Sequence, residues 1–156
     1  MNILKLLKPK AVIDYIYDDA TVRQAIEKMR NHGFTAIPVI NRDGEYVKTL
    51  AEGDFLYFML EKNLSGIKEL ERYSVSQITK RVKNNPVYIY STIEDLILLS
   101  MNQNFVPVID DRKVFIGIVT RRDILQYCYN AVRSGDPEYS AKEEEYQLSL
   151  IHISEP

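Results

Sequence analysis

The stretch Gly-Ile-Val-Thr-Arg-Arg-Asp at residues 117–123 decides how the rest of the chain is interpreted. Ile118 and Val119 are apolar and β-branched, as in a covered strand, and Thr120 with Asp123 has the spacing of a helix capping box. The first amides of a helix lack intrahelical partners and carry the positive end of its dipole, so a phosphate is favoured there beside two arginines. The stretch therefore predicts a strand that runs into a helix, with either a simple cap or an anion site at the junction.

Composition narrows the class of protein. The chain has 156 residues, 46% hydrophobic and 27% charged, enough for one domain or two small packed units. A net charge of −2 gives no general case for binding nucleic acid or a membrane, and no apolar run approaches the roughly 18 residues of a membrane span. The single cysteine, Cys128, excludes an intrachain disulfide and fits a reducing compartment. We expect a cytoplasmic, soluble protein.

The chain contains one motif twice. Pro38 and Pro107 are 69 residues apart, and so are Asp54 and Asp123. Each copy follows the order β-α-β-β-α, so the sequence predicts an α+β fold in which the two copies pack around a pseudo-twofold axis. The expected elements are a short helix before Pro9, a strand at 11–17, a helix at 21–31, strands at 34–40 and 46–50, an almost wholly apolar helix at 54–60, a strand at 87–90, a helix capped by Ser91 and Glu94, and strands at 105–109 and 114–119.

The repeat also sets the domain boundaries. We expect the first copy at residues 3–60, a linker at 61–85, the second copy at 86–130 and an acidic tail at 131–147. Residues 148–156 resemble the translation of an adapter used in DNA sequencing libraries, so we expect them to be an artefact rather than natural sequence.

The paired pattern resembles a tandem CBS-domain pair, also called a Bateman module. The resemblance rests on T-A-I-P-V-I at 35–40, F-V-P-V-I at 105–109 and G-I-V-T-R-R-D at 117–123, and it covers about residues 3–130. The second copy carries the more specific motif. Among CBS proteins, the chain is similar to small stand-alone pairs of Gram-positive bacteria, some of which bind cyclic di-AMP or adenine mononucleotides.

The resemblance implies a nucleotide cleft that joins the first copy to the motif of the second. An aromatic ring of Phe34 or Tyr15 would lie against adenine, Asp123 would hold ribose hydroxyls, and Thr120 with the arginines would hold phosphate. The residues implied for this cleft are Ile13, Asp14, Tyr15, Phe34, Thr35, Ala36, Thr120, Arg121, Arg122 and Asp123.

A second, weaker cleft is implied by the same symmetry, but the sequence departs from the family pattern there. Ala51 replaces the motif threonine, Lys48 replaces its glycine, and Glu52 with Asp54 places negative charge where a phosphate would lie. The residues implied for this weaker cleft are Val87, Tyr88, Asn104, Phe105 and Val106 with Lys48, Ala51, Glu52 and Asp54.

The resemblance implies a regulatory protein. The sequence also contains no His-x-x-x-His, Walker or nucleophile-elbow motif, so we do not expect an enzyme. We expect an adenine nucleotide as regulatory ligand, no metal or cofactor, a homodimer with helical seams at Asp54–Leu60 and Asp123–Cys128, and an unidentified regulated protein. The alternative is a nucleotide-free dimerisation scaffold, in which Thr120 and Asp123 only cap a helix.

Overall fold

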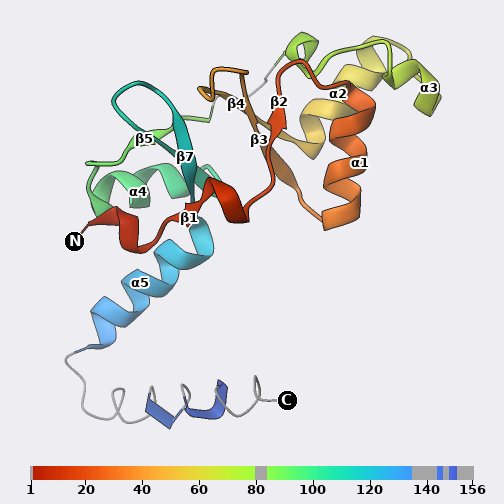
Figure 1. The fold of residues 1–156 in the computed structure, drawn as a ribbon. Helices are drawn as coiled ribbons and strands as arrows, with labels where there is room; N and C mark the ends of the chain where they lie inside the picture. Colours follow the sequence, from red (N-terminus) through yellow and green to blue (C-terminus); the bar gives the residue numbers. More distant parts are fainter. Residues whose placement is uncertain (1, 80–83, 135–143, 146–147, 151–156) are drawn as a thin grey trace. The chain divides into compact units, whose positions relative to one another are not determined.

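Two small sheets, one from each copy of the repeat, organise the first of the two units into which the chain divides, Met1–Arg121 and Arg122–Pro156. The structure is a computed structural model that describes residues 2–79, 84–134, 144–145 and 148–150. Most of the expected acidic tail and the end of the adapter-like segment therefore lie outside the described residues. Figure 1 shows both sheets with their helices.

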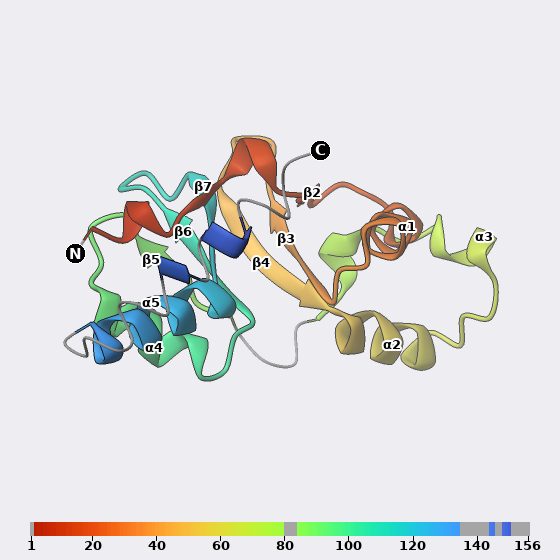
Figure 2. The same cartoon turned by 90° about the horizontal axis from the view of Figure 1, so that it is seen from below.

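The first copy forms the expected β-α-β-β-α unit. Its three-stranded sheet has the order β2-β3-β4, with β2 parallel and β4 antiparallel to β3. Figure 2 shows α1 and α2 beside this sheet. The elements are β2 (Ile16–Tyr17), α1 (Val22–His32), β3 (Ala36–Ile40), β4 (Tyr46–Ala51) and α2 (Glu52–Glu61).

Helix α1 begins and ends one residue later than the predicted range 21–31, and both of its ends are capped. Thr21 accepts a hydrogen bond from the Gln24 amide at 3.1 Å, and the Gln24 side chain accepts one from the Thr21 amide at 2.9 Å. At the other end Gly33 adopts the left-handed conformation, with φ of 69°. The buried side of α1, which includes Ala25 and Met29, packs into the core of the first copy.

The second copy repeats the order of elements. These are β5 (Val87–Tyr88), α4 (Ile93–Ser100), β6 (Phe105–Ile109), β7 (Phe115–Thr120) and α5 (Arg121–Arg133). Its helix α4 begins one residue later than expected. Thr92 and Asp95 form the capping box, while the Ser91 hydroxyl instead accepts a hydrogen bond from the Tyr88 amide. The predicted Ser91–Glu94 cap is therefore wrong.

The hairpins of the two copies meet with twofold symmetry. The Tyr46 amide donates to the Lys113 carbonyl, and the Phe115 amide donates to the Gly44 carbonyl, at 3.3 and 2.9 Å. Each of these residues has its counterpart 69 positions away on the other hairpin. The pseudo-twofold axis therefore passes between Glu45 and Val114, which pair as an isolated bridge.

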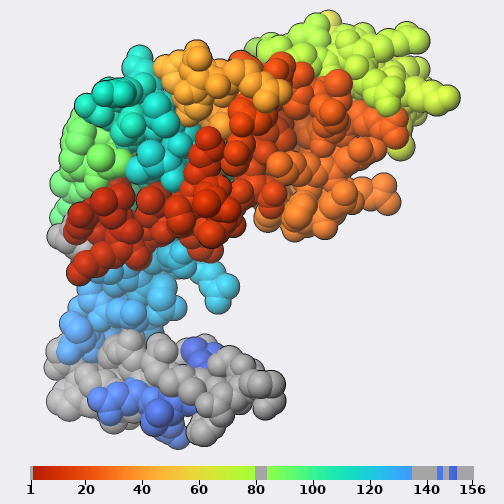
Figure 3. All heavy atoms as spheres, viewed as in Figure 1, coloured from red at the N-terminus to blue at the C-terminus, as the bar shows by residue number. Residues whose placement is uncertain are grey.

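The N-terminal segment, up to strand β2, departs from the prediction. The expected strand at 11–17 is a strand only at Ile16–Tyr17, and the expected N-terminal helix is only the short 3₁₀ helix η1 (Ile3–Lys5). Strand β1 (Lys8–Pro9) follows and joins the sheet of the second copy in the order β1-β7-β6-β5. A second 3₁₀ helix, η2 (Lys10–Val12), leads towards β2. Figure 3 shows this N-terminal segment in red, beside the teal second copy.

The connection between the copies packs on the first copy. It contains α3 (Ile67–Leu70) and the 3₁₀ helix η3 (Val75–Gln77), both within the expected linker at 61–85. Leu70, Val75 and Ile78 are buried in the core of the first copy. In the unit Arg122–Pro156, the described residues are helical along the rest of α5 to Arg133.

Candidate functional site

A cavity of about 340 Å³ opens in the unit Met1–Arg121, and both copies of the repeat contribute to its walls. We call it the inter-copy cavity. Its volume lies near the lower end of the range for small-molecule sites. Its lining is mostly apolar, with a few polar side chains at its edges. The lining residues are Lys8, Val12, Ile13, Asp14, Phe34, Thr35, Ala36, Pro38, Phe105, Ile118 and Thr120.

Six of the ten residues expected in the first cleft line this cavity. Phe34, Thr35 and Ala36 arrive there because α1 stops at Gly33 and β3 starts at Ala36, so the residues between them span the gap. The Phe34 amide donates to the Met29 carbonyl at 3.0 Å. The Phe34 ring stacks on His32, with ring centroids 5.5 Å apart and an angle of 11° between the planes. Phe34 remains 36% exposed, so part of this side chain is available at the cavity that it lines.

Ile13 and Asp14 line the cavity from the segment between η2 and β2. The Asp14 carboxylate lies 3.9 Å from Lys28 Nζ and 3.5 Å from His32 Nδ1, both on α1. The nearby ammonium of Lys28 partly offsets the charge of Asp14, and a protonated His32 would add to this effect. Asp14 therefore repels an anionic ligand less than an unpaired carboxylate would.

Tyr15 has a different environment from its neighbours. Its ring packs edge-on against Tyr17 and Phe115, and the ammonium groups of Lys10 and Lys28 lie 5.0 and 5.7 Å from the ring centroid. Burial raises the pKa of the Tyr15 phenol, and Tyr17 raises it further. These contacts favour a packing role for Tyr15, and the stacking role that we expect for this ring stays a prediction.

The second copy contributes Thr120, at the end of β7, to the opposite wall. The side chain of Arg121 points elsewhere, because its Nε donates a hydrogen bond to the Ser100 carbonyl at the end of α4, at 2.7 Å. Arg122 and Asp123 belong to the unit Arg122–Pro156, on the first turn of α5. Their proposed roles towards a ligand stay predictions.

The second-copy residues expected in the weaker cleft have different environments from one another. Val87 and Val106 are buried in the core of the second copy. Tyr88 is exposed and stacks on Tyr90, with centroids 5.2 Å apart. Phe105 lines the inter-copy cavity instead.

The first-copy residues expected in that cleft have structural contacts too. The buried Asp54 accepts a hydrogen bond from the Ala51 amide at 2.8 Å, so it caps α2. Lys48 Nζ donates to the Ile78 carbonyl at 2.7 Å. These contacts supply a structural reason for the sequence departures at both positions, and a ligand in this cleft stays the weaker prediction.

Sequence reasoning missed several residues of the inter-copy cavity, of which Lys8 and Val12 come from the N-terminal segment. Gly117, the glycine of the second-copy motif, could have indicated that a backbone segment packs closely there. A Cβ at Gly117 would lie 2.2 Å from the Lys8 carbonyl oxygen, and Gly117 has φ of 155°. Glycine at this position is what lets β1 pair with β7 and brings Lys8 to the cavity.

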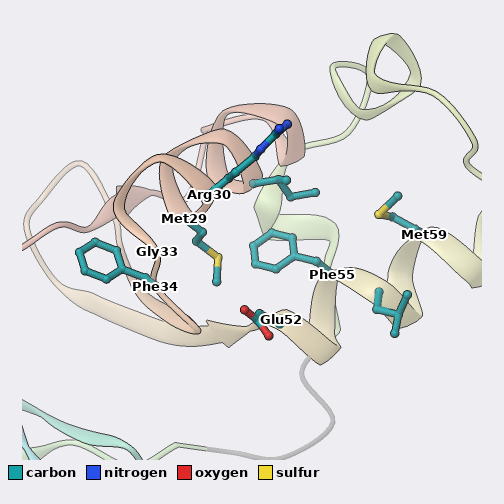
Figure 4. Close-up of a pocket in the computed structure, with 9 residues that line it drawn as sticks. Met29, Arg30, Gly33, Phe34, Glu52, Phe55 and Met59 are labelled. Carbon is teal, nitrogen blue, oxygen red and sulfur yellow. The ribbon is translucent and has the colours of Figure 1, made fainter.

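A second, apolar cavity of about 440 Å³ lies between α1 and α2, and we call it the α1–α2 groove. Figure 4 shows Met29 and Phe55 between Arg30 and Glu52. Phe34 lines this groove as well as the inter-copy cavity. The remaining lining residues are Ile26, Gly33, Leu56 and Met59.

The described residues contain neither a cluster of metal-ligating side chains nor a helix that could span a membrane. Within residues 2–79, 84–134, 144–145 and 148–150, no three acidic, histidine or cysteine side chains gather as a metal site would require. Across the same residues, none of the helices has the length and apolar character needed to cross a bilayer.

Comparisons with known proteins bear on the family and the fold. A sequence model of the CBS domain matches residues 8–61 and 75–130. A CBS domain-containing protein of Dictyostelium discoideum is 26% identical over 133 residues, which cover 77% of this chain and 87% of that protein.

Two solved structures of similar fold contain nucleotides. CbpB in complex with c-di-AMP superposes with a TM-score of 0.77 at 21% identity, covering 89% of this chain and 91% of CbpB. CBSX2 in complex with AMP gives a TM-score of 0.66 at 21% identity, covering 85% of this chain and 98% of CBSX2. At these identities the likeness shows a shared fold.

Proposed function

Because this chain belongs to the CBS domain family, with two copies of the domain, we propose that it is a regulatory protein that binds an adenine nucleotide in the inter-copy cavity. The ligand would be AMP, ADP, ATP or cyclic di-AMP. Binding would change the affinity for a regulated protein, and the chain would perform no chemical step itself. The observation that carries the proposal is the shared lining of this cavity, with Phe34, Thr35 and Ala36 from one copy and Thr120 from the other.

The lining suits the parts of a nucleotide. Adenine is flat and aromatic, and Phe34, Ile13, Pro38 and Ile118 supply apolar surface for it. The Thr120 hydroxyl is a suitable partner for phosphate. In the CBS family the aspartate of the second-copy motif holds ribose, and we propose that role for Asp123.

A ligand in this cavity would act by touching both copies at once. It can shift a conformational equilibrium only by its difference in affinity between the two states. Since the walls come from both copies and from the N-terminal segment, a ligand would favour the arrangement that keeps these three parts together. The resulting change in surface or stability is what a regulated protein would detect.

A thermal-shift panel tests the proposal. AMP, ADP, ATP, cyclic di-AMP, S-adenosylmethionine and NAD are added to the wild type, to Asp123→Ala and to Asp111→Ala, an exposed aspartate in the hairpin turn of the second copy that serves as control. A ligand at about 100 times its dissociation constant should stabilise the native state by about 2.7 kcal/mol, which is a shift of about 5–10 °C for a chain of this size.

The outcomes distinguish a nucleotide-binding regulatory protein from a nucleotide-free dimerisation scaffold. Asp123→Ala should lose most of the shift, and Asp111→Ala should keep it. If none of the six ligands moves the unfolding temperature of the wild type, the nucleotide-free dimerisation scaffold becomes the better description.

A further inference from the structure

We propose that Asp14 determines the base specificity of the inter-copy cavity by accepting a hydrogen bond from the exocyclic amino group of adenine. The inference rests on the proposed function, because it concerns the same cavity. Among the described residues that line this cavity, Asp14 has the one carboxylate. The phosphate of a nucleotide gains nothing from a second negative charge, so the carboxylate suits an uncharged donor group of the ligand.

Asp14 lies at the same end of the cavity as the Phe34 ring. The two side chains have a common neighbour, since the Asp14 carboxylate is 3.5 Å from His32 Nδ1 and the Phe34 ring stacks on the His32 ring with centroids 5.5 Å apart. Phe34 is 36% exposed and lines the cavity, so part of this side chain is accessible to a base. A base that contacts Phe34 therefore has Asp14 beside it, whereas the Thr120 hydroxyl, proposed for the phosphate, comes from the other copy.

The contacts that Asp14 makes with α1 leave it able to accept this bond. The carboxylate is 3.9 Å from Lys28 Nζ and 3.5 Å from His32 Nδ1, both longer than the roughly 2.7–3.2 Å of a usual N–H···O hydrogen bond. Its two oxygens offer about four lone-pair sites, so sites would remain for a ligand even if both groups moved closer. The positive charge of Lys28 also lowers the cost of excluding water from the carboxylate when a ligand binds.

The hydrogen-bonding groups of the purine edge set the expected specificity. A carboxylate accepts hydrogen bonds and donates none, so it favours the 6-amino group of adenine over a C–H group or a carbonyl oxygen at the same position. A hydrogen bond to a charged group is stronger than a neutral one. An analogue that lacks the donor would in addition leave the Asp14 carboxylate desolvated without this partner. The cavity should therefore reject purines that have no 6-amino group.

Calorimetric titration with AMP and purine riboside 5′-monophosphate tests this assignment, because the two have the same charge and differ only in the 6-amino group. The wild type should bind AMP about 10-fold more tightly than the analogue. Asp14→Ala should reduce this ratio to about twofold or less, and Asp14→Asn, which keeps an acceptor oxygen, should retain part of it. Taking the ratio within each variant cancels the effect of the lost charge on the phosphate. Asp43→Ala removes a carboxylate from an exposed turn of the first copy, so it should keep the wild-type ratio.

Three results would overturn the assignment. One is a wild type that binds AMP and its analogue equally, which needs no variant and so holds even if Asp14→Ala fails to fold. Another is a full preference for AMP in Asp14→Ala. The third is an Asp14→Ala variant that instead loses its discrimination between AMP and 2′-deoxy-AMP, which would place the carboxylate at the ribose.

Each of these results leaves the proposed function intact. A wild type that binds GMP more tightly than AMP, or that binds none of the adenine nucleotides, would instead refute adenine-nucleotide binding, and the role of Asp14 with it.

Discussion

Tyr46 lies half-buried at the point where the two hairpins meet. Its ring stacks on Phe115 with centroids 6.2 Å apart, and its hydroxyl is 2.8 Å from the Thr49 hydroxyl. Burial raises the pKa of Tyr46 to about 12. The unfolded chain loses this proton near pH 10, so between about pH 10 and 12 the unfolded state binds fewer protons than the native state. Stability from this group is complete below pH 10 and is lost as pH rises towards 12.

The expected loss is about 2 kcal/mol of unfolding free energy for the wild type over this pH range. Urea unfolding at pH 9, 10, 11 and 12, followed by circular dichroism, measures it. Tyr46→Phe should be less stable than the wild type at pH 9 by about 1 kcal/mol, since Thr49 loses a partner, yet should lose less on going to pH 12. Tyr90→Phe alters an exposed phenol and should behave as the wild type. An unchanged alkaline loss in Tyr46→Phe would contradict the buried-phenol explanation.

Individual site residues could be predicted where the motif fixes the backbone around them. Phe34 to Ala36 follow a helix that must end at Gly33, so their arrival at a strand edge follows from local rules. The direction of a long side chain is not fixed in that way. Whether Arg121 turns to a ligand or to the Ser100 carbonyl depends on a packed neighbour 21 positions away, which the motif does not specify.

At the scale of elements, the pairing of β1 with β7 is the feature that local sequence rules did not predict. Lys8–Pro9 is a two-residue strand with a proline, and its partners on β7 are 108 to 110 positions away along the chain. The repeats could be recognised because each β-α-β-β-α unit is built from local periodicity and turn residues. A short segment that adds to the sheet of the other copy carries no such pattern.

Gly117→Ala tests the importance of this pairing. The new Cβ would meet the Lys8 carbonyl and the φ of 155° is a region that only glycine occupies readily, so we expect a loss of about 1–3 kcal/mol of unfolding free energy. Because β1 is displaced, hydrogen exchange at the Ile118 amide and its neighbours should also accelerate. Gly53→Ala is the matched control, since a Cβ there meets only Tyr57 at 3.9 Å and alanine favours the helix. Equal stability of Gly117→Ala and wild type would mean that β1 does not hold the sheet.

At the scale of the whole molecule, the pseudo-twofold symmetry is kept in the backbone and broken at the clefts. The Glu52 amide donates to the Thr35 carbonyl, and its counterpart, the Arg121 amide, donates to the Asn104 carbonyl. Yet Lys48 stands where Gly117 stands in the second copy, and Ala51 stands where Thr120 does. One cleft therefore keeps both the close strand approach and the hydroxyl, and we propose that the nucleotide binds there alone.

The same symmetry supports the prediction of a homodimer. The sequence indicates burial of α2 on all sides, but only Phe55 and Phe58 enter the core, and Leu56 and Leu60 are more than half exposed. Their counterparts 69 positions later, Leu125 and Tyr129 on α5, are also more than half exposed. Apolar residues conserved in position between the copies but left in solvent are typical of a surface that a second protein chain covers.

The double variant Leu56→Glu with Leu60→Glu tests this assignment. Light scattering after size exclusion should give the wild type twice the 18.1 kDa mass of the chain and the variant the mass of one chain. In a dimer of the variant, the glutamates of one chain would lie desolvated against those of the other and repel them. Leu98→Glu alters an equally exposed leucine on α4 and should remain dimeric. The α1–α2 groove, which includes Leu56, should become more accessible in the monomer. A wild type that elutes as one chain at micromolar concentration would contradict the homodimer.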